Sequence, residues 1–361
     1  MAVPRLKRVR VDRGPFSDRL LSRERLTGTL SLSCEVVREI CGLDNFLHIG
    51  SGAAELVYDR ERIRKLVRAS RNIQELIRHI SNNPDVLKVE HLDVVKYAGE
   101  PYIPGTSLKG MVRARLELSF SAVNNTVKAC FTRASQSIPA PGTPDWVHFS
   151  LWQPAILELR GRICDLTKGR RACVVCDLLG APGLASRVYF GNLRRESGEL
   201  VRLEVRYHRG VEKLLAMEPG SRFTEGEVAF RSLSEAELGL LLVGMGFTDQ
   251  GDSVPVLMGK NKYEVMRVID SDPPKWRGKK VRFGAVRFHV EGLRLLEISE
   301  GELSLRSLEG EELKKFIASC VKKALNEFPG LRQAKEPRFS EAEELCKILA
   351  GGGRSCPASN S

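Results

Sequence analysis

The residues with the clearest capacity for chemistry are three cysteines in one short stretch. Cys164 is followed by Cys173 and Cys176, and two valines separate the last pair. A two-residue gap lets neighbouring thiolates share one tetrahedral Zn²⁺. His148 is the expected fourth ligand, and Cys130 is its substitute. A redox pair is the alternative, but nothing in the pattern puts the pair at the start of a helix that follows a strand, so structural zinc is favoured.

A second stretch, GEPYIPGTSLKG at residues 99–110, predicts a turn that runs into a helix. Thr106 or Ser107 can cap this helix, and Lys109 and Arg113 are four residues apart, which places them on one face. Backbone N–H groups, hydroxyls and a cation at a helix start make an anion site. The alternative is an ordinary capped surface helix with an exposed lysine.

Two further groups give weaker signals. In LMGKNKYEV, a glycine stands beside Lys260, Lys262 and a tyrosine, which suits a loop that contacts an RNA backbone, although a plain β-turn has the same composition. In KVEHLDVVKYAGEPYIPG, Glu90, His91 and Asp93 suit an ordinary polar loop by their pattern alone.

The composition favours a polyanionic partner. Lys and Arg outnumber Asp and Glu by 57 to 45, a formal charge of +12. Nucleic acid is the first expectation, an anionic membrane surface the second, and a merely solvated basic surface the plain alternative. No apolar run approaches the roughly 20 residues that span a bilayer, so we expect a cytoplasmic protein with no membrane partner. Nine scattered cysteines argue against a disulfide framework and suit a reducing compartment.

The elements that position these groups alternate between strands and helices in an α+β order. We expect a basic N-terminal arm over 1–25 and a core over 26–300. Within the core lie an insert at 57–90, with an amphipathic basic helix over 60–81, and an irregular cysteine-rich insert at 124–176. Ser234 and Glu237 predict a capping box. Two helices should fill 301–350, before a disordered tail at 351–361.

Three segments together resemble a known family. FLHIGSG, GEPYIPGTSLKGMVRARLE and CVVCDLLGAPGLASRVYFGNL resemble, in order, the hallmark segments of the RAMP proteins that form the backbone of type III CRISPR effector complexes, the Csm and Cmr type. The resemblance covers roughly residues 26–290. It implies a modified ferredoxin-like (RRM-like) RAMP core, a zinc-braced insert and a thumb-like hairpin. It also implies CRISPR RNA, target single-stranded RNA, other type III effector subunits and further copies of the chain as partners.

The resemblance also implies which residues touch RNA. By match to its segments, guide contacts fall on Ser107, Lys109 and Arg113 and on Ser186 and Arg187. The full set expected to bind RNA is His48, Gly50, Ser51, Thr106, Ser107, Lys109, Arg113, Ser186, Arg187, Lys260 and Lys262.

The resemblance implies two alternatives for the cleavage of target RNA. Relatives that cut carry an aspartate between the first two segments, and the matching slot here falls on Glu90 or His91, with Asp93 displaced. Asp93 with Mg²⁺ or another divalent cation is the expected catalytic pair, and a non-cleaving backbone subunit is the alternative. Two rivals are a metal-independent RAMP endonuclease that processes CRISPR transcripts with His48 or His91 as its base, and a zinc-containing RNA-binding protein unrelated to CRISPR.

Overall fold

The computed structural model describes residues 6–17, 20, 24–83, 85–131, 139, 143–207, 210–299 and 302–350. Its larger sheet has nine strands, and long antiparallel pairs of β3 with β16 and with β20 form its centre. The strands of this sheet, in spatial order, are β17 (Val256–Leu257), β20 (Ala285–Ser299), β3 (Leu26–Val36), β16 (Arg222–Leu233), β13 (Leu193–Ser197), β9 (Glu100–Ile103) and β8 (Lys96–Tyr97), with β12 (Val188–Phe190) on β16 and β21 (Glu302–Leu308) on β20.

A second sheet of eight strands adjoins the first and has its own apolar core, which includes Phe46, Leu203 and Phe283. Its order is β4 (Glu39–Ile40), β5 (Leu43–Phe46), β19 (Lys280–Phe283), β18 (Met266–Asp272), β14 (Leu200–Tyr207), β15 (Gly210–Met217), β7 (Leu87–Val94) and β6 (Gly50–Tyr58). The mixed content agrees with the predicted α+β class. A ferredoxin-like core is a finer statement that stays a prediction.

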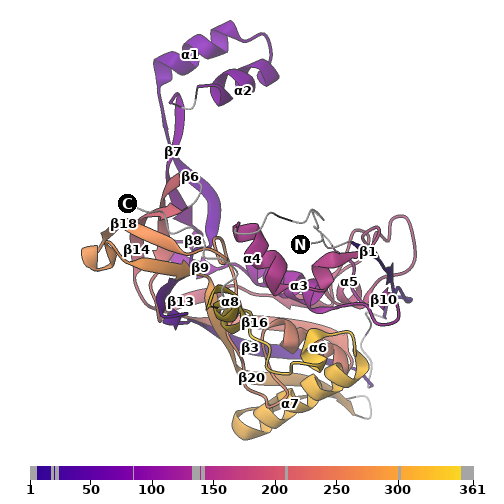
Figure 1. The fold of residues 1–361 in the computed structure, drawn as a ribbon. Helices are drawn as coiled ribbons and strands as arrows, with labels where there is room; N and C mark the ends of the chain where they lie inside the picture. Colours follow the sequence, from indigo (N-terminus) through magenta and orange to yellow (C-terminus); the bar gives the residue numbers. More distant parts are fainter. Residues whose placement is uncertain are drawn as a thin grey trace.

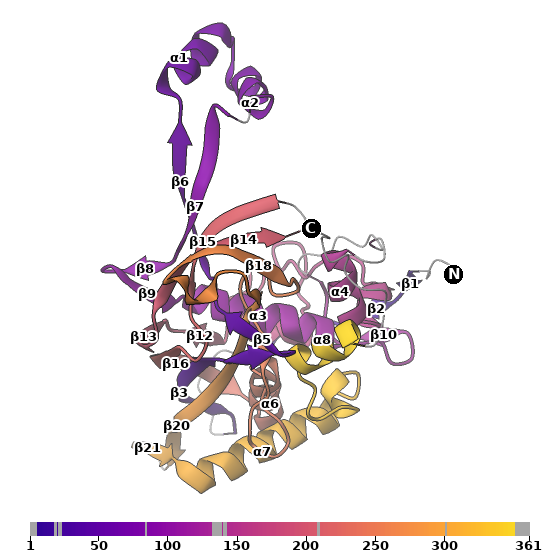
Figure 2. The ribbon, with the colours of Figure 1, turned by 60° about the vertical axis from the view of Figure 1, so that its left-hand side comes forward.

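Helices cover one face of the nine-stranded sheet (Figure 2). They are α3 (Gly105–Ser119), α6 (Glu235–Gly244) and α7 (Gly310–Glu327). The predicted capping box at Ser234 and Glu237 is present and starts α6, whose residues from Ala236 to Gly244 are all buried. Short helices α4 (Pro144–Leu151) and α5 (Val174–Leu179) belong to the cysteine-rich insert, which is therefore less irregular than predicted. No helix among the described residues is long and apolar enough to cross a membrane.

The insert near residues 57–90 projects from the body on strands β6 and β7 (Figure 1). The prediction of one helix over 60–81 is wrong, because two helices form, α1 (Arg60–Ala69) and α2 (Ile73–Ser81). The Asp59 carboxylate caps α1, and the Asn72 side chain accepts the Glu75 N–H and starts α2. The Ser70–Asn72 junction thus divides a stretch whose apolar spacing alone suggested continuity.

The N-terminal arm is not a free basic end where it is described. Residues 6–17 run along the cysteine-rich insert, and two short strands pair with it in parallel. These are β1 (Lys7–Arg8) on β11 (Glu158–Leu159) and β2 (Arg10–Val11) on β10 (Thr126–Val127). Val9 and Val11 are buried there, so the packing of apolar residues between the arginines fixes the arm.

The C-terminal region differs from the prediction in two ways. Residues 302–308 form strand β21, so the helical part begins only with α7, and α8 (Glu341–Ala350) follows. A disulfide joins Cys41 to Cys346 on α8, a single covalent link that the argument against a disulfide framework did not anticipate. The predicted disordered tail at 351–361 lies outside the described residues.

Candidate functional site

Two segments that are far apart in the sequence meet at residues 47–50. The His48 carbonyl accepts the Lys260 N–H at 3.3 Å, which brings the loop after β17 onto this segment. Gly259 makes the approach possible, because its φ is +84° and a Cβ there would lie 2.5 Å from the His48 oxygen. The His48 ring is 1% exposed and bonds the Leu215 carbonyl through Nδ1 at 2.6 Å. His48 therefore holds this junction together and does not present its ring to RNA or act as a base, which corrects both predictions.

The same segment leads to the start of α3. Val95 N–H bonds the Ile49 carbonyl at 3.1 Å, and Tyr102 N–H bonds the Val95 carbonyl at 3.3 Å, immediately before the turn. At the turn a Cβ on Gly105 would lie 2.0 Å from the Phe190 carbonyl oxygen, so a side chain is excluded. The Gly105 N–H bonds Asn192 Oδ1 at 2.9 Å. The first two hallmark segments are thus adjacent, and the second is anchored on the end of the third.

The start of α3 presents polar groups, although its cap differs from the prediction. Pro104 is the N-cap and no side chain caps the helix, so Thr106 and Ser107 lie in its first turn. Thr106 is exposed, and Ser107 and Lys109 are half-buried. Burial, with a smaller contribution from nearby Arg113, lowers the pKa of Lys109. Among the described residues no side chain forms an ion pair or hydrogen bond with the Lys109 ammonium, so this half-buried cation can pair with an anion.

Three residues expected to contact RNA serve the interior in this structure. The Arg113 guanidinium lies 3.7 Å from Cys176 Sγ, 3.5 Å from Glu117 Oε1 and also bonds the Gly180 carbonyl. The Arg187 side chain is 0% exposed and pairs with Asp177 at 2.7 Å and with Glu237. Both guanidinium groups are therefore engaged within the fold, which argues against the prediction that they contact RNA.

Ser186 is similarly engaged, because its Oγ donates to the Val188 carbonyl at 2.6 Å and accepts the Val188 N–H at 3.2 Å. In the 259–263 loop, Lys260 Nζ is 2.8 Å from Glu212 Oε1 and half exposed. Lys262 Nζ contacts the Leu257 carbonyl at 3.4 Å and the Tyr263 ring at 5.4 Å. The two lysines border the junction at residues 47–50, and Gly50 is exposed there. The Ser51 side chain lies outside the described residues.

Four buried cysteines form a candidate metal centre (the cysteine cluster: Cys130, Cys164, Cys173 and Cys176), with all four sulfurs within 4.8 Å of one another. The Cys130 sulfur is 3.5 Å from that of Cys176 and 3.7 Å from that of Cys173. Zn–S bonds of about 2.3 Å at tetrahedral angles place sulfurs about 3.8 Å apart. The donor set and spacing therefore suit a tetrahedral metal ion.

Cations and hydrogen bonds surround the cluster. Arg13 Nε donates to Cys164 Sγ at 3.3 Å, and an Arg113 guanidinium nitrogen lies 3.7 Å from Cys176 Sγ. Hydrogen bonds from the thiols of Cys130, Cys173 and Cys176 lower the pKa of Cys164. Cys173 is the N-cap of α5, so the pair does begin a helix, contrary to the sequence argument against redox chemistry. Four converging thiols favour a metal ion over a redox pair, because a redox pair needs only two of them.

His148 is not part of the cysteine cluster, so its prediction as a ligand is wrong and Cys130 takes that place. The His148 ring packs on Tyr263 with centroids 4.9 Å apart. Burial, with a contribution from Lys262, lowers the pKa of His148 to about 4, so the ring is neutral near pH 7. His148 belongs to the packing between α4 and the 259–263 loop.

The three proposed catalytic residues, Glu90, His91 and Asp93, all lie in strand β7. Asp93 pairs with Lys96 at 3.0 Å, and its Oδ1 also accepts the Val94 N–H at 2.8 Å. The side chains of Glu90 and His91 lie outside the described residues. In the part of the chain that the structure describes, the cysteines are the only group of three or more His, Cys, Asp or Glu side chains close enough to share a metal ion. Within those residues, Asp93 therefore has no two such partners with which to share a metal ion.

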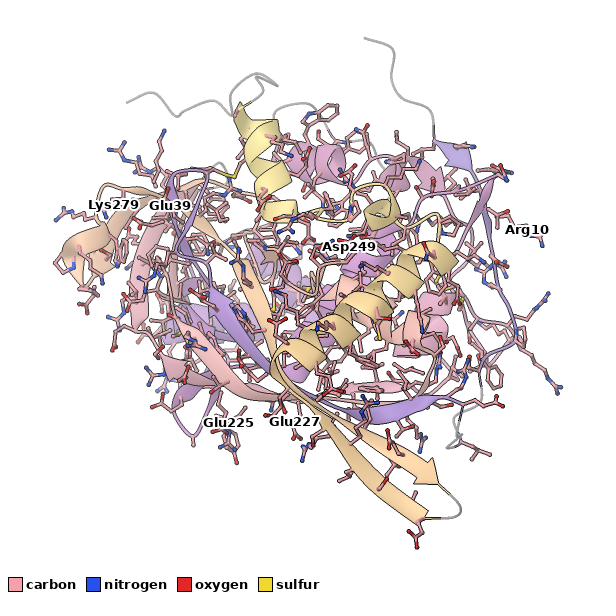
Figure 3. All side chains as sticks on the ribbon, turned by 90° about the horizontal axis from the view of Figure 1, so that it is seen from below. Arg10, Glu39, Glu225, Glu227, Asp249 and Lys279 are labelled. Atoms are coloured by element: carbon pink, nitrogen blue, oxygen red, sulfur yellow. A yellow bond between two sulfur atoms is a disulfide. The ribbon has the colours of Figure 1, made fainter. Side chains whose placement is uncertain are left out.

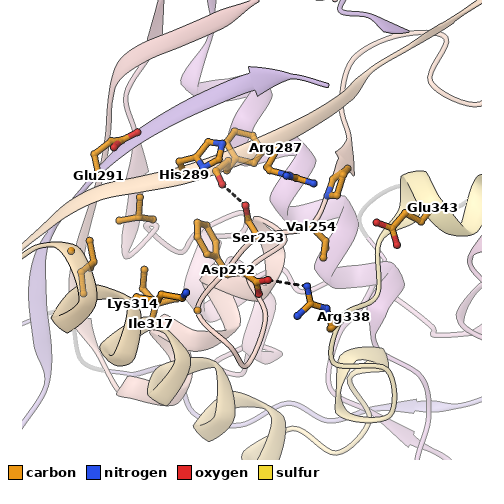
Figure 4. A pocket seen from close by; sticks show the side chains of 17 residues that line it. Asp252, Ser253, Val254, Arg287, His289, Glu291, Lys314, Ile317, Arg338 and Glu343 are labelled. Atoms are coloured by element: carbon orange, nitrogen blue, oxygen red, sulfur yellow. Dashed lines mark hydrogen bonds and ion pairs between the residues drawn. The ribbon is translucent and has the colours of Figure 1, made fainter. Parts of the chain in front are cut away.

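A separate cavity of about 520 Å³ lies between β20, α7 and the 247–255 loop (Figure 4). The Asp252–Arg338 ion pair, at 2.8 Å, crosses part of it. Acidic and basic groups are balanced in its lining, which includes Arg287, Lys314, Arg338, Asp252, Glu291 and Glu343. A balanced lining gives no preference for a polyanion, so we do not assign this cavity to RNA.

Comparison with known proteins gives a family. No curated protein matches the chain significantly. Among solved structures, the chain is similar to the crystal structure of Csc2 from Thermofilum pendens, with 11% sequence identity and a TM-score of 0.34 over 94% of this chain and 93% of that chain. The family model of the RAMP superfamily matches residues 43–317, which contain all three hallmark segments. The chain therefore belongs to the RAMP superfamily.

Proposed function

We propose that the chain is an RNA-binding backbone subunit of a CRISPR effector complex, of the type III (Csm and Cmr) class. The observation that carries this proposal is the contact of residues 47–50 with the 259–263 loop and, through Val95 and Tyr102, with the turn before α3, the helix that carries the half-buried Lys109. Thr106, Ser107, Lys109, Gly50, Lys260 and Lys262 form the proposed RNA surface.

The physical basis of binding is contact with phosphate. An approaching phosphate would accept hydrogen bonds from the Lys109 ammonium and the Thr106 hydroxyl at a helix start, where the backbone dipole also favours an anion. Binding of this kind depends on salt and carries no sequence information. Base pairing between guide and target would supply the sequence specificity, as in other RNA-guided systems.

The projecting hairpin is a second proposed contact with nucleic acid. Residues 60–81 contain seven Arg or Lys and two Glu, and neither α1 nor α2 has a buried residue. Val67, Ile73 and Ile77 are 50%, 73% and 59% exposed on the same two helices. Helices α1 and α2 are basic, expose apolar side chains and project from the body on β6 and β7. These features support the role of a thumb-like hairpin that lies against the guide–target duplex.

We also propose that the cysteine cluster holds zinc. Four thiolates and one Zn²⁺ leave two net negative charges, and Arg13 and Arg113 stand beside two of the sulfurs. Bound there, the ion would brace the insert against the N-terminal strands and α3. The charge of the site thus supports zinc over four neutral thiols, and its role would be structural.

For target RNA, we propose binding without cleavage by this chain. The isolation of Asp93 from other metal ligands in the described residues favours this over a divalent-metal nuclease. A metal-independent processing enzyme is disfavoured for His48, which is buried and bonded to Leu215. CRISPR RNA, target RNA and other effector subunits remain the proposed partners.

Sequencing of the RNA that copurifies with the full chain tests the proposal. The chain should be expressed together with a CRISPR array and a control pool of unrelated RNA. We expect retained RNA with a constant repeat-derived end, because the chain would hold the guide backbone at a fixed register. Retention of the unrelated pool without enrichment of array transcripts would contradict a CRISPR role while leaving general RNA binding in place.

A further inference from the structure

Strand β21 forms an open edge of the nine-stranded sheet. It pairs with β20 from Leu293↔Leu308 to Ser299↔Glu302, and β20 is its only partner among the described strands. In an antiparallel ladder about half of the backbone N–H and C=O groups point away from the paired strand. All six residues from Glu302 to Ser307 are exposed. The hairpin projects beyond the body, as Figure 3 shows, so its outer edge is accessible.

Apolar side chains add to this open edge. Leu303 is 65% exposed and Leu305 is 69% exposed. They are two residues apart and so lie on one face of the strand, and Leu305 stands directly opposite Leu296 of β20. A shallow hollow next to this pair is lined by Leu296, Leu305 and Tyr189. Edge strands are usually protected by lysine, proline or a bulge, and β21 contains neither lysine nor proline.

We propose that β21 pairs with β21 of a second copy of this chain, antiparallel and about a two-fold axis through Ser304. In this register Glu302 stands opposite Arg306 of the copy, and Leu303 stands opposite Leu305 of the copy. Both pairs occur twice because of the symmetry. Two opposite-charge pairs and two leucine pairs therefore form at once across a continuous sheet, and opposed pairs of either kind stabilise a sheet.

The sequence of β21 favours this register over its neighbours. A shift of the axis to Leu305 would place Leu303 opposite Ser307 and Arg306 opposite Ser304. The charge pairs and both Leu303–Leu305 pairs would then be lost. Complementarity of the strand with itself is the reason to choose a second copy over an unrelated peptide. Strand β21 contains no residue of the proposed RNA surface, so dimer formation and RNA binding can each be refuted without the other.

Arg306 already has partners within the chain, which the pairing must accommodate. Its guanidinium is 2.8 Å from Glu312 and 3.9 Å from Glu297, and its side chain is about half exposed. Exposed ion pairs of this kind contribute little to stability. The Arg306 side chain can therefore turn to Glu302 of a second copy, or share its donors between the two carboxylates.

A cysteine placed on the proposed axis gives the most specific test. Residues opposite one another in an antiparallel pair have Cα atoms about 4.5–5.5 Å apart, within the range of a disulfide. We expect Ser304→Cys in the full chain to form a covalent dimer under mild oxidation. Ser307→Cys is the matched control, because the register separates the two copies of residue 307 by about 20 Å. Equal crosslinking of both variants, or none of Ser304→Cys, would overturn the register.

A charge exchange measured by sedimentation gives an independent test. We expect wild type to dimerise reversibly, and Glu302→Lys to raise the dimer dissociation constant roughly tenfold, because two attractive cross-strand pairs become repulsive. The double variant Glu302→Lys/Arg306→Glu should restore the wild-type constant. A wild-type chain that stays monomeric, or a double variant as weak as Glu302→Lys, would overturn the proposal.

Discussion

Replacement of Cys130 by serine tests whether the cysteine cluster is a metal centre. Cys130 and its three partners are each at most 2% exposed, so the cluster is shielded from bulk solvent that could replace a lost ligand. A serine hydroxyl does not replace a thiolate as a zinc ligand. We therefore expect about one zinc per chain in wild type, by elemental analysis after gel filtration, and almost none in Cys130→Ser.

The loss of the metal should also reduce stability. Structural zinc supplies roughly 10–16 kcal/mol in small peptides, which compares with about 5–15 kcal/mol for a whole folded domain. Removal of one partner from a buried charged group costs about 3–5 kcal/mol. We expect Cys130→Ser to lower the free energy of unfolding by at least that amount, measured by urea titration, with early proteolysis between residues 124 and 176.

Two controls separate this account from its alternatives. Cys34→Ser removes a cysteine that is as buried as Cys130 but lies in β3, outside the cluster, and should keep full zinc content. His148→Ala should also keep it, because His148 packs on Tyr263 and not on the cluster. Full zinc content in Cys130→Ser would refute the four-cysteine site, and loss of zinc in His148→Ala would restore the original ligand prediction.

Three other predictions follow from the described side chains. Replacement of residues 60–81 by a glycine–serine linker should leave the melting temperature nearly unchanged, because α1 and α2 bury no residue. The slope of log affinity for RNA against log salt concentration should nevertheless fall by more than one unit, at about 0.7 per lost phosphate contact. An unchanged slope would show that α1 and α2 are not part of the RNA interface. Since the pKa of His148 falls from 6.5 to about 4 on folding, the unfolded chain binds the proton more readily, so up to about 3 kcal/mol of stability present above pH 6.5 should disappear as the pH falls through 4. Urea titrations between these pH values should show that the free energy of unfolding falls with pH in wild type and not in His148→Phe. The same pH dependence in both proteins would contradict a role of His148. Asp93→Asn should change neither RNA binding nor any slow target cleavage, and a cleavage activity that the variant abolishes would establish Asp93 as the catalytic acid.

The sequence was informative wherever a short segment determines its own structure. The capping box at Ser234 and Glu237 needs only residues three apart, and it is present as predicted. Apolar spacing likewise predicted α7 and α8. The same spacing failed over 60–81, because it takes no account of Asn72, whose side chain starts a new helix. Periodicity indicates which face is apolar, while caps decide where a helix begins.

Tertiary contacts explain the failures at the candidate site. Arg187 stands in a hallmark segment, and its sequence context cannot distinguish a cation for phosphate from one for Asp177 and Glu237 in the interior. The choice between His148 and Cys130 depended on which segment folds back onto the cysteine pair. Asn192, which holds the Gly105 N–H, was missed because its only signal was its place at the end of the third segment.

The salt dependence of RNA binding by Lys109→Ala tests the central claim most directly. Affinity for a single-stranded RNA should be measured over a range of salt for wild type, Lys109→Ala and Lys347→Ala, a control lysine on α8 that is 73% exposed and paired with Glu344. We predict that Lys109→Ala lowers the log–log slope by about 0.7 and weakens binding roughly tenfold, since one phosphate contact is lost. Lys347→Ala should match wild type. An unchanged slope in Lys109→Ala, or an equal loss in both variants, would contradict a phosphate contact at the start of α3.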